Sequence, residues 1–207
     1  MARGGKRATI MLAAKSVFAG KGYRAATVQD ILDEAKVARA TFYKYFAGKR
    51  HVFSEIIRAF LETLYQNTKE YLILESSDSG VIGERIRESL AMFYRLFLEN
   101  RGVVGVYFGE AFRVDPGLYA VWDDFERRMT VLFARILERG IEGGAFRDVD
   151  VDLVARAMLM IFTQVPYREV MARMQASIDV ESMADELSGF VMHGLAVDSE
   201  DKASKRE

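Results

Sequence analysis

Apolar residues return every three to four positions through most of the chain, the spacing of an amphipathic helix. The first such stretch covers residues 7–19, and Gly20 and Gly22 end it. The six residues before it are predicted to form a flexible basic arm. Two short helices are predicted next, over residues 28–35 behind an N-cap at Thr27 and over residues 38–45, joined by a turn at Lys36 and Val37.

The rest of the chain continues the helical pattern. A longer helix follows Gly48 and ends near residue 74, where the turn formers of residues 76–80 interrupt the pattern. Further helices are predicted at about 83–99, 103–113, 117–139, 151–172 and 180–196. Pro166 falls inside one of them and predicts a kink or an early stop. Residues 198–207 are charged, lack large apolar groups and are predicted to be disordered.

The two short helices over about 27–46 have the layout of a helix-turn-helix. Phe42 can dock the second helix against the core, which leaves its polar side chains facing outward. Arg39 and Lys44 can donate to guanine edges or to phosphates, and the methyl groups of Ala40 and Thr41 can lie against thymine methyls. This helix is therefore predicted to enter a DNA major groove.

Four further residues are predicted to hold phosphates. Tyr43 and Tyr45 carry hydroxyls suited to phosphate oxygens, while Thr27 and Lys49 stand at helix N-termini, where free backbone N–H groups favour an anion. Two alternatives stay open: Tyr45 can pack against the body, and Lys44 can be merely solvated.

The charge distribution is consistent with DNA binding at one end. Residues 1–50 carry 11 Lys and Arg against 3 Asp and Glu, a balance of +8, whereas residues 51–207 carry 18 against 27, a balance of −9. A basic head on an acidic body concentrates the attraction for a polyanion at the head.

Residues 7–57 resemble the TetR (tetracycline-repressor-like) family of bacterial regulators. The resemblance rests on an ordered series of residues: Ala13, Ala14, Phe18, Gly22, Tyr23, Thr27, Val28, Asp30, Ile31, Ala35, Val37, Thr41, Phe42, Tyr43, Tyr45, Phe46 and Lys49. It implies an all-α homodimer whose three N-terminal helices bind DNA and whose C-terminal helices bind a small molecule and the partner subunit. It also implies repression that an inducer relieves.

Two residues depart from the family pattern. Lys36 occupies a turn position usually held by glycine, and a left-handed conformation there costs a non-glycine residue about 1–2 kcal/mol. Ala38 replaces the usual serine cap of the second helix, which forfeits about 1 kcal/mol of capping. Both departures predict a slightly less stable helix-turn-helix.

Aromatic residues and methionine concentrate between residues 90 and 136. We predict that they line an apolar ligand pocket, with ordinary core packing as the alternative. The candidates are Phe93, Phe97, Tyr107, Phe108, Phe112, Trp122, Phe125 and Met129. Charged neighbours such as Glu110 are expected to be solvated.

The last two helices carry broad apolar stripes, which suit a four-helix bundle made by two subunits. The dimer-interface candidates are Leu153, Ala157, Ile161, Leu187, Phe190, Val191 and Leu195. A dimer also has a mechanistic reason, since a two-fold pair of short recognition helices reads two half-sites.

Little in the chain points to an enzyme. Cysteine is absent, His51 and His193 are the only histidines, and the common nucleotide-binding, hydrolase and zinc-protease motifs do not occur. We predict no catalytic residue, no metal site and no cofactor. The absence of an apolar run of about 18 residues and of a signal-peptide core predicts a cytoplasmic protein without membrane association.

The sequence therefore predicts an all-α, ligand-responsive transcriptional regulator. Residues 1–50 form the DNA-binding domain, residues 51–197 the helical ligand-binding and dimerisation domain, and residues 198–207 a tail. Its partners are double-stranded operator DNA, a small apolar or amphipathic inducer and a second copy of the chain. Repression is expected; activation by the same fold and nonspecific structural DNA binding are the alternatives.

Overall fold

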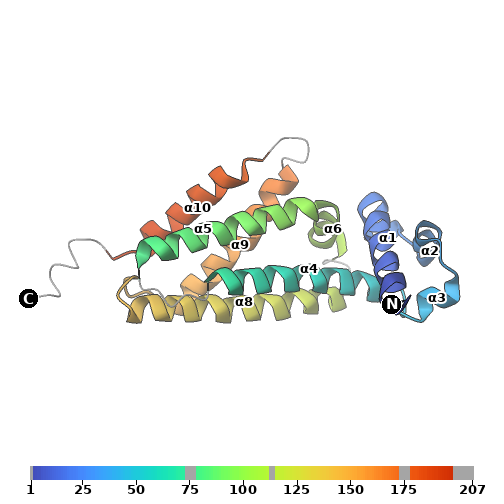
Figure 1. Ribbon diagram of the computed structural model, residues 1–207, viewed down its shortest axis with the longest axis horizontal. Helices are drawn as coiled ribbons and strands as arrows, with labels where there is room; N and C mark the ends of the chain where they lie inside the picture. The colour runs from blue at the N-terminus through green and yellow to red at the C-terminus, as the bar shows by residue number, and fades with distance from the viewer. Residues whose placement is uncertain (1, 73–77, 112–114, 173–177, 198–207) are drawn as a thin grey trace, which may run out of the picture. The chain divides into compact units, whose positions relative to one another are not determined.

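The computed structural model describes residues 2–72, 78–111, 115–172 and 178–197, and their secondary structure is helical (Figure 1). Across these residues no β-strand forms, and the one extended pairing is an isolated bridge between Phe146 and Ala196. The elements in order are α1 (Ala2–Ala25), α2 (Val28–Ala35), α3 (Arg39–Tyr43), α4 (Lys49–Leu72), α5 (Ser79–Glu99), α6 (Arg101–Val106), the π-helical turn η1 (Tyr107–Ala111), α8 (Pro116–Glu142), α9 (Val151–Ala172) and α10 (Val180–Leu195). The all-α prediction is confirmed.

The chain forms two compact units. The first unit comprises Met1–Thr63 and Asn100–Asp124, and the second comprises Leu64–Glu99 and Phe125–Glu207. Helices α4 and α8 each contribute residues to both units. The reading helices thus share a unit with α6, η1 and the start of α8.

The core of the first unit is aromatic. Phe18, Phe42, Phe46 and Phe53 are at most 1% exposed. The rings of Phe18 and Phe53 meet edge to face at 4.6 Å, an arrangement that aromatic quadrupoles favour. Phe42 docks α3 as the sequence predicts, because it is the one residue of that short helix that is buried.

Local rules explain the boundaries of the reading helices. Thr27 and Asp30 form a complete capping box at the start of α2, in which each side chain bonds the backbone N–H of the other. Lys36 ends α2 in the left-handed conformation, with φ 53°. Ala38 offers no side-chain hydrogen bond to α3. These findings confirm the predicted cap, the predicted strain and the predicted loss of capping.

The second unit packs α5 against α9 and α10. Phe93 of α5, Phe133 of α8 and Phe162 of α9 are fully buried. The centre of the Phe162 ring lies 5.4 Å from that of Phe93 and 4.9 Å from that of Phe133, so one side chain contacts two other helices. None of the described helices is long and apolar enough to cross a membrane.

Two predicted boundaries are wrong. The predicted flexible basic arm is helical: α1 begins at Ala2 and continues through Gly4 and Gly5, although glycine is a poor helix former. The early stop at Pro166 does not occur, since α9 runs on to Ala172 and buries the proline ring, while the kink, the other predicted outcome, stays a prediction. Packing there compensates for the backbone hydrogen bond that proline cannot donate. The predicted tail, residues 198–207, lies outside the described residues.

Candidate DNA-binding surface

The outer face of α3 exposes most of the predicted DNA-contacting residues. Arg39, Ala40, Tyr43 and Lys44 are exposed, and 48% of Tyr43 is accessible. Thr41 and Tyr45 are half-buried, so each can still present a polar atom at the edge of the surface. The predicted contacts thus share one surface, which is compatible with a helix entering the major groove.

Arg39 is oriented by a neighbouring helix. Its Nη2 donates to Oε1 of Gln29 at 3.0 Å, and Nε2 of Gln29 donates to Oδ1 of Asp33 at 2.8 Å. This chain of bonds extends the guanidinium over α2. The sequence alone does not single out Gln29, although a glutamine ten residues before Arg39 is a recognisable polar partner.

Thr27 is occupied by its capping role. Its hydroxyl donates to Oδ2 of Asp30 at 2.8 Å and accepts the Asp30 backbone N–H at 3.1 Å. Asp30 also pairs with Lys21 at 2.6 Å, and these bonds, that from Lys21 first, lower the pKa of the Asp30 carboxyl to about 2. The carboxylate therefore stays charged and the cap stays formed across the physiological range.

Lys49 is held inside the unit. Its Nζ donates to three backbone carbonyls, those of Tyr23 at 2.8 Å, Ala26 at 2.9 Å and Arg24 at 3.2 Å. It also lies 4.8 Å from the centre of the Tyr23 ring. These carbonyls stand where α1 ends and would otherwise lack partners, so Lys49 ties the start of α4 to the end of α1. Its contact with a phosphate stays a prediction.

We expect Lys49→Met to lower the free energy of unfolding by about 2 kcal/mol, because the methylene stem remains while three carbonyls lose a charged donor. Urea unfolding measures this change. If Lys49 also holds a phosphate, the slope of operator affinity against salt falls by about one unit. Unchanged stability would contradict the anchoring role, whatever happens to the slope.

A shallow depression opens at the N-terminus of α4. Ala47, Gly48, Arg50, His51 and Ser54 line it, and the Nδ1 atom of His51 accepts the Ala47 backbone N–H at 3.0 Å. A helix N-terminus beside an exposed arginine suits a phosphate oxygen.

Glu110 of η1 anchors the loop after α1. Its carboxylate accepts the backbone N–H of Tyr23 at 3.1 Å and that of Arg24 at 2.8 Å. Gly22 makes this approach possible, because it has φ 78° and because a Cβ there would lie 2.8 Å from the carboxylate. The expectation that Glu110 is solvated is therefore wrong: its side chain is only 31% exposed and is bonded 87 residues back along the chain.

Asp115 makes a second anchor to the same region. It accepts the hydroxyl of Tyr23 at 3.0 Å and pairs with Arg50 at 3.3 Å. Burial, followed by the bond to Asp115, raises the pKa of Tyr23 to about 12. Two carboxylates thus connect the segment after α6 to the end of α1 and the start of α4.

The raised pKa of Tyr23 predicts a loss of stability in strong base. The unfolded phenol ionises near pH 10, whereas the folded phenol stays neutral to about pH 12. The contribution of the neutral Tyr23 phenol to the free energy of unfolding is complete below pH 10 and is lost as the pH rises to 12. Between these values we expect wild type to lose about 2 kcal/mol more unfolding free energy than Tyr23→Phe. Denaturant unfolding of both proteins at each pH measures the difference, and parallel curves would refute the assignment.

The predicted ligand-pocket residues are mostly packed in the cores. Tyr107, Trp122, Phe125 and Met129 are at most 5% exposed, as are Phe93 and Phe97. Phe108 is half-buried and meets the rings of Tyr107 and Trp122, whereas Phe112 lies outside the described residues. Three cavities in the described part of the chain are lined by other residues. The ligand pocket at these residues stays a prediction.

An apolar groove runs between α9 and α10, with a free volume of about 410 Å³. It is lined by Arg147, Val154, Ala157, Met158, Ile161, Phe190, Val191, His193, Gly194 and Leu195. Five of the seven predicted dimer residues belong to it; of the other two, Leu153 is 58% exposed and Leu187 is half-buried. Phe190 is 70% exposed, which is unusual for a large apolar side chain.

Within the described residues, no group of three or more His, Asp or Glu residues is placed to hold a metal ion. The candidate surface consists of hydrogen-bond donors, aromatic rings and cationic side chains. Such groups bind and orient a polyanion.

Family models match both parts of the chain. Residues 10–56 match the model of bacterial regulatory proteins of the tetR family, and residues 79–167 match that of the tetracyclin repressor-like C-terminal domain. The first match contains α2, α3 and the Lys49 contacts, whereas Glu110 and Asp115 lie in the second match.

Individual relatives extend the likeness. The transcriptional repressor KstR2 of Mycobacterium tuberculosis is 30% identical over 153 residues, which cover 73% of this chain and 74% of that protein. KstR2 of Rhodococcus jostii is 28% identical over 196 residues, which cover 94% of this chain and 93% of that protein. The solved structure of Bacillus subtilis FadR in complex with stearoyl-CoA shares the fold, with a TM-score of 0.76 at 19% identity, over 90% of this chain and 98% of that one.

Proposed function

Because the chain belongs to the TetR family of bacterial regulatory proteins, we propose that it is a homodimeric transcriptional repressor. It binds a palindromic operator through α3, and a small amphipathic ligand releases it. The observation that carries this proposal is the docked reading helix, in which Phe42 is buried while Arg39, Ala40, Tyr43 and Lys44 face outward.

Repression is supported by the named relatives, since both KstR2 proteins are transcriptional repressors. The dimer is supported by the groove between α9 and α10, whose apolar wall and exposed Phe190 would be covered by a second copy. A two-fold pair of α3 helices then reads two half-sites, which gives the operator its palindromic form.

The ligand class is supported by a neighbour of the same fold. FadR was solved with stearoyl-CoA, a molecule with a long apolar chain and a charged head. In this chain, α4 and α8 carry residues of both units, so they give a continuous route from a ligand held by the second unit to the helix-turn-helix. Glu110 and Asp115 would transmit a shift of η1 and α8 to the end of α1 and the start of α4.

The proposed release from DNA is tested by the effect of operator and stearoyl-CoA on each other's binding. If stearoyl-CoA weakens operator binding by some factor, operator must weaken stearoyl-CoA binding by the same factor. Calorimetric titration of stearoyl-CoA into the protein, with and without bound operator, measures that factor. A factor of about 5 to 150 is expected, and equal affinities in both titrations would refute release by this ligand.

Arg39 is expected to specify one base pair. Arg39→Ala should weaken operator binding by about 1–3 kcal/mol and relax the preference at a single position of each half-site. Gln29→Ala is the matched variant, because it removes the 3.0 Å bond that orients Arg39 and keeps the guanidinium. Competition binding with a set of single-position operator variants measures both. An unchanged preference in Arg39→Ala would show that another residue reads that base pair.

A further inference from the structure

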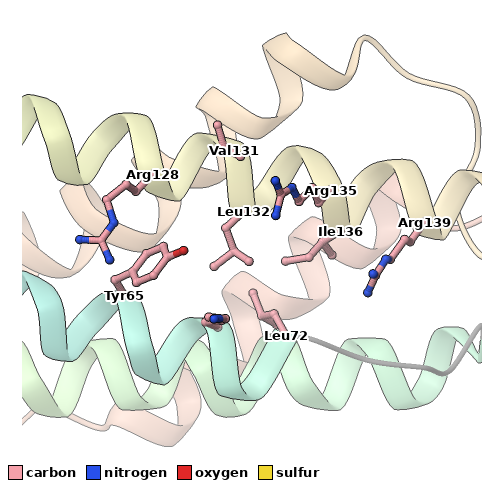
Figure 2. Close-up of a pocket in the computed structure, with 9 residues that line it drawn as sticks. Tyr65, Leu72, Arg128, Val131, Leu132, Arg135, Ile136 and Arg139 are labelled. Carbon is pink, nitrogen blue, oxygen red and sulfur yellow. The ribbon is translucent and has the colours of Figure 1, made fainter.

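A second groove, lying between α4 and α8 in the second unit, carries four cationic side chains. Its nine lining residues are Tyr65, Lys69, Leu72, Arg128, Val131, Leu132, Arg135, Ile136 and Arg139, and its free volume is about 170 Å³. Figure 2 shows Leu72 and Leu132 projecting toward one another at its floor, with Arg128 and Arg139 at its two ends. None of the lining residues is acidic.

The cations are unusual for this part of the chain. Residues 51–207 carry a net charge of −9, and Arg87 of α5 is paired with carboxylates of α5 and α10. In contrast, Lys69, Arg135 and Arg139 are exposed and have no ion pair with any residue that the structure describes. The groove thus places three cations without an ion pair among the described residues, Lys69, Arg135 and Arg139, beside Arg128 on an otherwise acidic body.

One of the four cations is held in place. The guanidinium of Arg128 lies 3.9 Å from the centre of the Tyr65 ring, a cation–π contact between the two walls of the groove. Figure 2 shows the two side chains stacked at one end. A fixed cation loses less conformational entropy when it binds an anion, so this end of the groove is preorganised.

The spacing of the cations indicates the kind of anion. Residues 128, 135 and 139 follow one face of α8 at intervals of seven and four, so they span about 16 Å along the helix axis. A single carboxylate is satisfied by one arginine fork and would leave the other cations unused. Several negative charges spread along one molecule would engage them all, and an apolar part could rest on Leu72, Leu132 and Ile136.

We propose that this groove binds an organic phosphate, a small molecule with two or more phosphate charges and an attached apolar group. The apolar floor and the four cations select such a molecule over a neutral lipid or a simple fatty acid. The identification of this molecule as the effector rests on the proposed function, whereas binding in the groove does not and can be measured without DNA.

Calorimetry with three probes tests the groove: coenzyme A, stearoyl-CoA and stearate. The first two carry the phosphate groups, and the last carries only the chain. Arg135→Gln/Arg139→Gln should weaken both coenzyme A and stearoyl-CoA at least tenfold, since each lost charged bond is equivalent to about a factor of ten. Stearate should bind wild type and the variant equally. Arg156→Gln of α9 is the control, because Arg156 is an exposed arginine that does not line the groove.

Four results would overturn the proposal. Three concern the ligand: a coenzyme A affinity unchanged by the double variant, an equal loss in Arg156→Gln, and no binding of coenzyme A or stearoyl-CoA to wild type. The fourth is weaker binding of random-sequence duplex by the double variant, which would make the groove a DNA contact. If the groove proposal fails while wild type still binds a palindromic operator, the regulator function stands and only the ligand site is wrong.

Discussion

Phe190→Asp is expected to convert the protein into a monomer and to lower its affinity for a palindromic operator roughly a hundredfold or more. In a single chain, Phe190 is 70% exposed beside the apolar wall formed by Ala157 and Ile161. Burying a phenylalanine side chain stabilises by about 1.5–3 kcal/mol, and a two-fold interface buries two of them. An aspartate there would bring two like charges into an otherwise apolar interface and remove the buried rings, so the dimer should dissociate.

The expected loss of operator affinity follows because the two α3 helices are no longer held in one dimer. Two α3 helices held in one dimer bind the second half-site intramolecularly, which raises affinity by about 10² to 10⁴ over one helix alone. Analytical ultracentrifugation and operator binding measure the two effects. Val81→Asp is the control, because Val81 of α5 is 44% exposed and does not line the groove. A dimeric Phe190→Asp protein would place the subunit interface elsewhere.

Glu110→Ala is expected to lower the free energy of unfolding by about 2 kcal/mol, because two backbone N–H groups lose a charged acceptor. This value is below the sum of about 3–6 kcal/mol usual for two hydrogen bonds to a charged group, because the Glu110 side chain is 31% exposed and is partly screened by solvent. The amide hydrogens of Tyr23 and Arg24 should also exchange faster with solvent. Operator affinity should fall as well, since the end of α1 is no longer held against η1.

Glu110→Gln separates the hydrogen bonds from the charge. Its amide oxygen can still accept one N–H, so an intermediate loss of stability is expected. Denaturant unfolding and amide hydrogen exchange followed by NMR measure these changes. If the Tyr23 and Arg24 amides exchange at the wild-type rate in Glu110→Ala, the anchor does not form in solution.

Features set by neighbouring residues could be predicted from the sequence. The N-cap of α2 at Thr27, with Asp30 three residues on, follows from a rule that spans a few residues. The left-handed Lys36 and the uncapped Ala38 follow from the resemblance to the family, whose pattern has glycine and serine at these positions. Burial of Phe42 follows from the period of its helix. The exposure of Arg39 and the other α3 residues came with it, because the opposite face of a docked helix is the free one.

Contacts between distant segments could not be predicted in the same way. Glu110 reaches the backbone of Tyr23 across 87 residues, and nothing in the local pattern distinguishes it from a solvated glutamate. Lys49 resembles a phosphate contact in the sequence, yet the structure places three carbonyls around its ammonium group. The basic groove combines one lysine of α4 with three arginines of α8, so its charge is visible only after the two helices are paired.

Selection of bound duplexes from a random library, using the purified protein, tests the central claim most directly. We predict a palindromic consensus whose two half-sites are related by the two-fold axis of the dimer. Arg39→Ala should return the same palindrome with one relaxed position in each half-site. An unenriched pool, despite tight binding at low salt, would instead indicate nonspecific association with the phosphate backbone and would contradict the account.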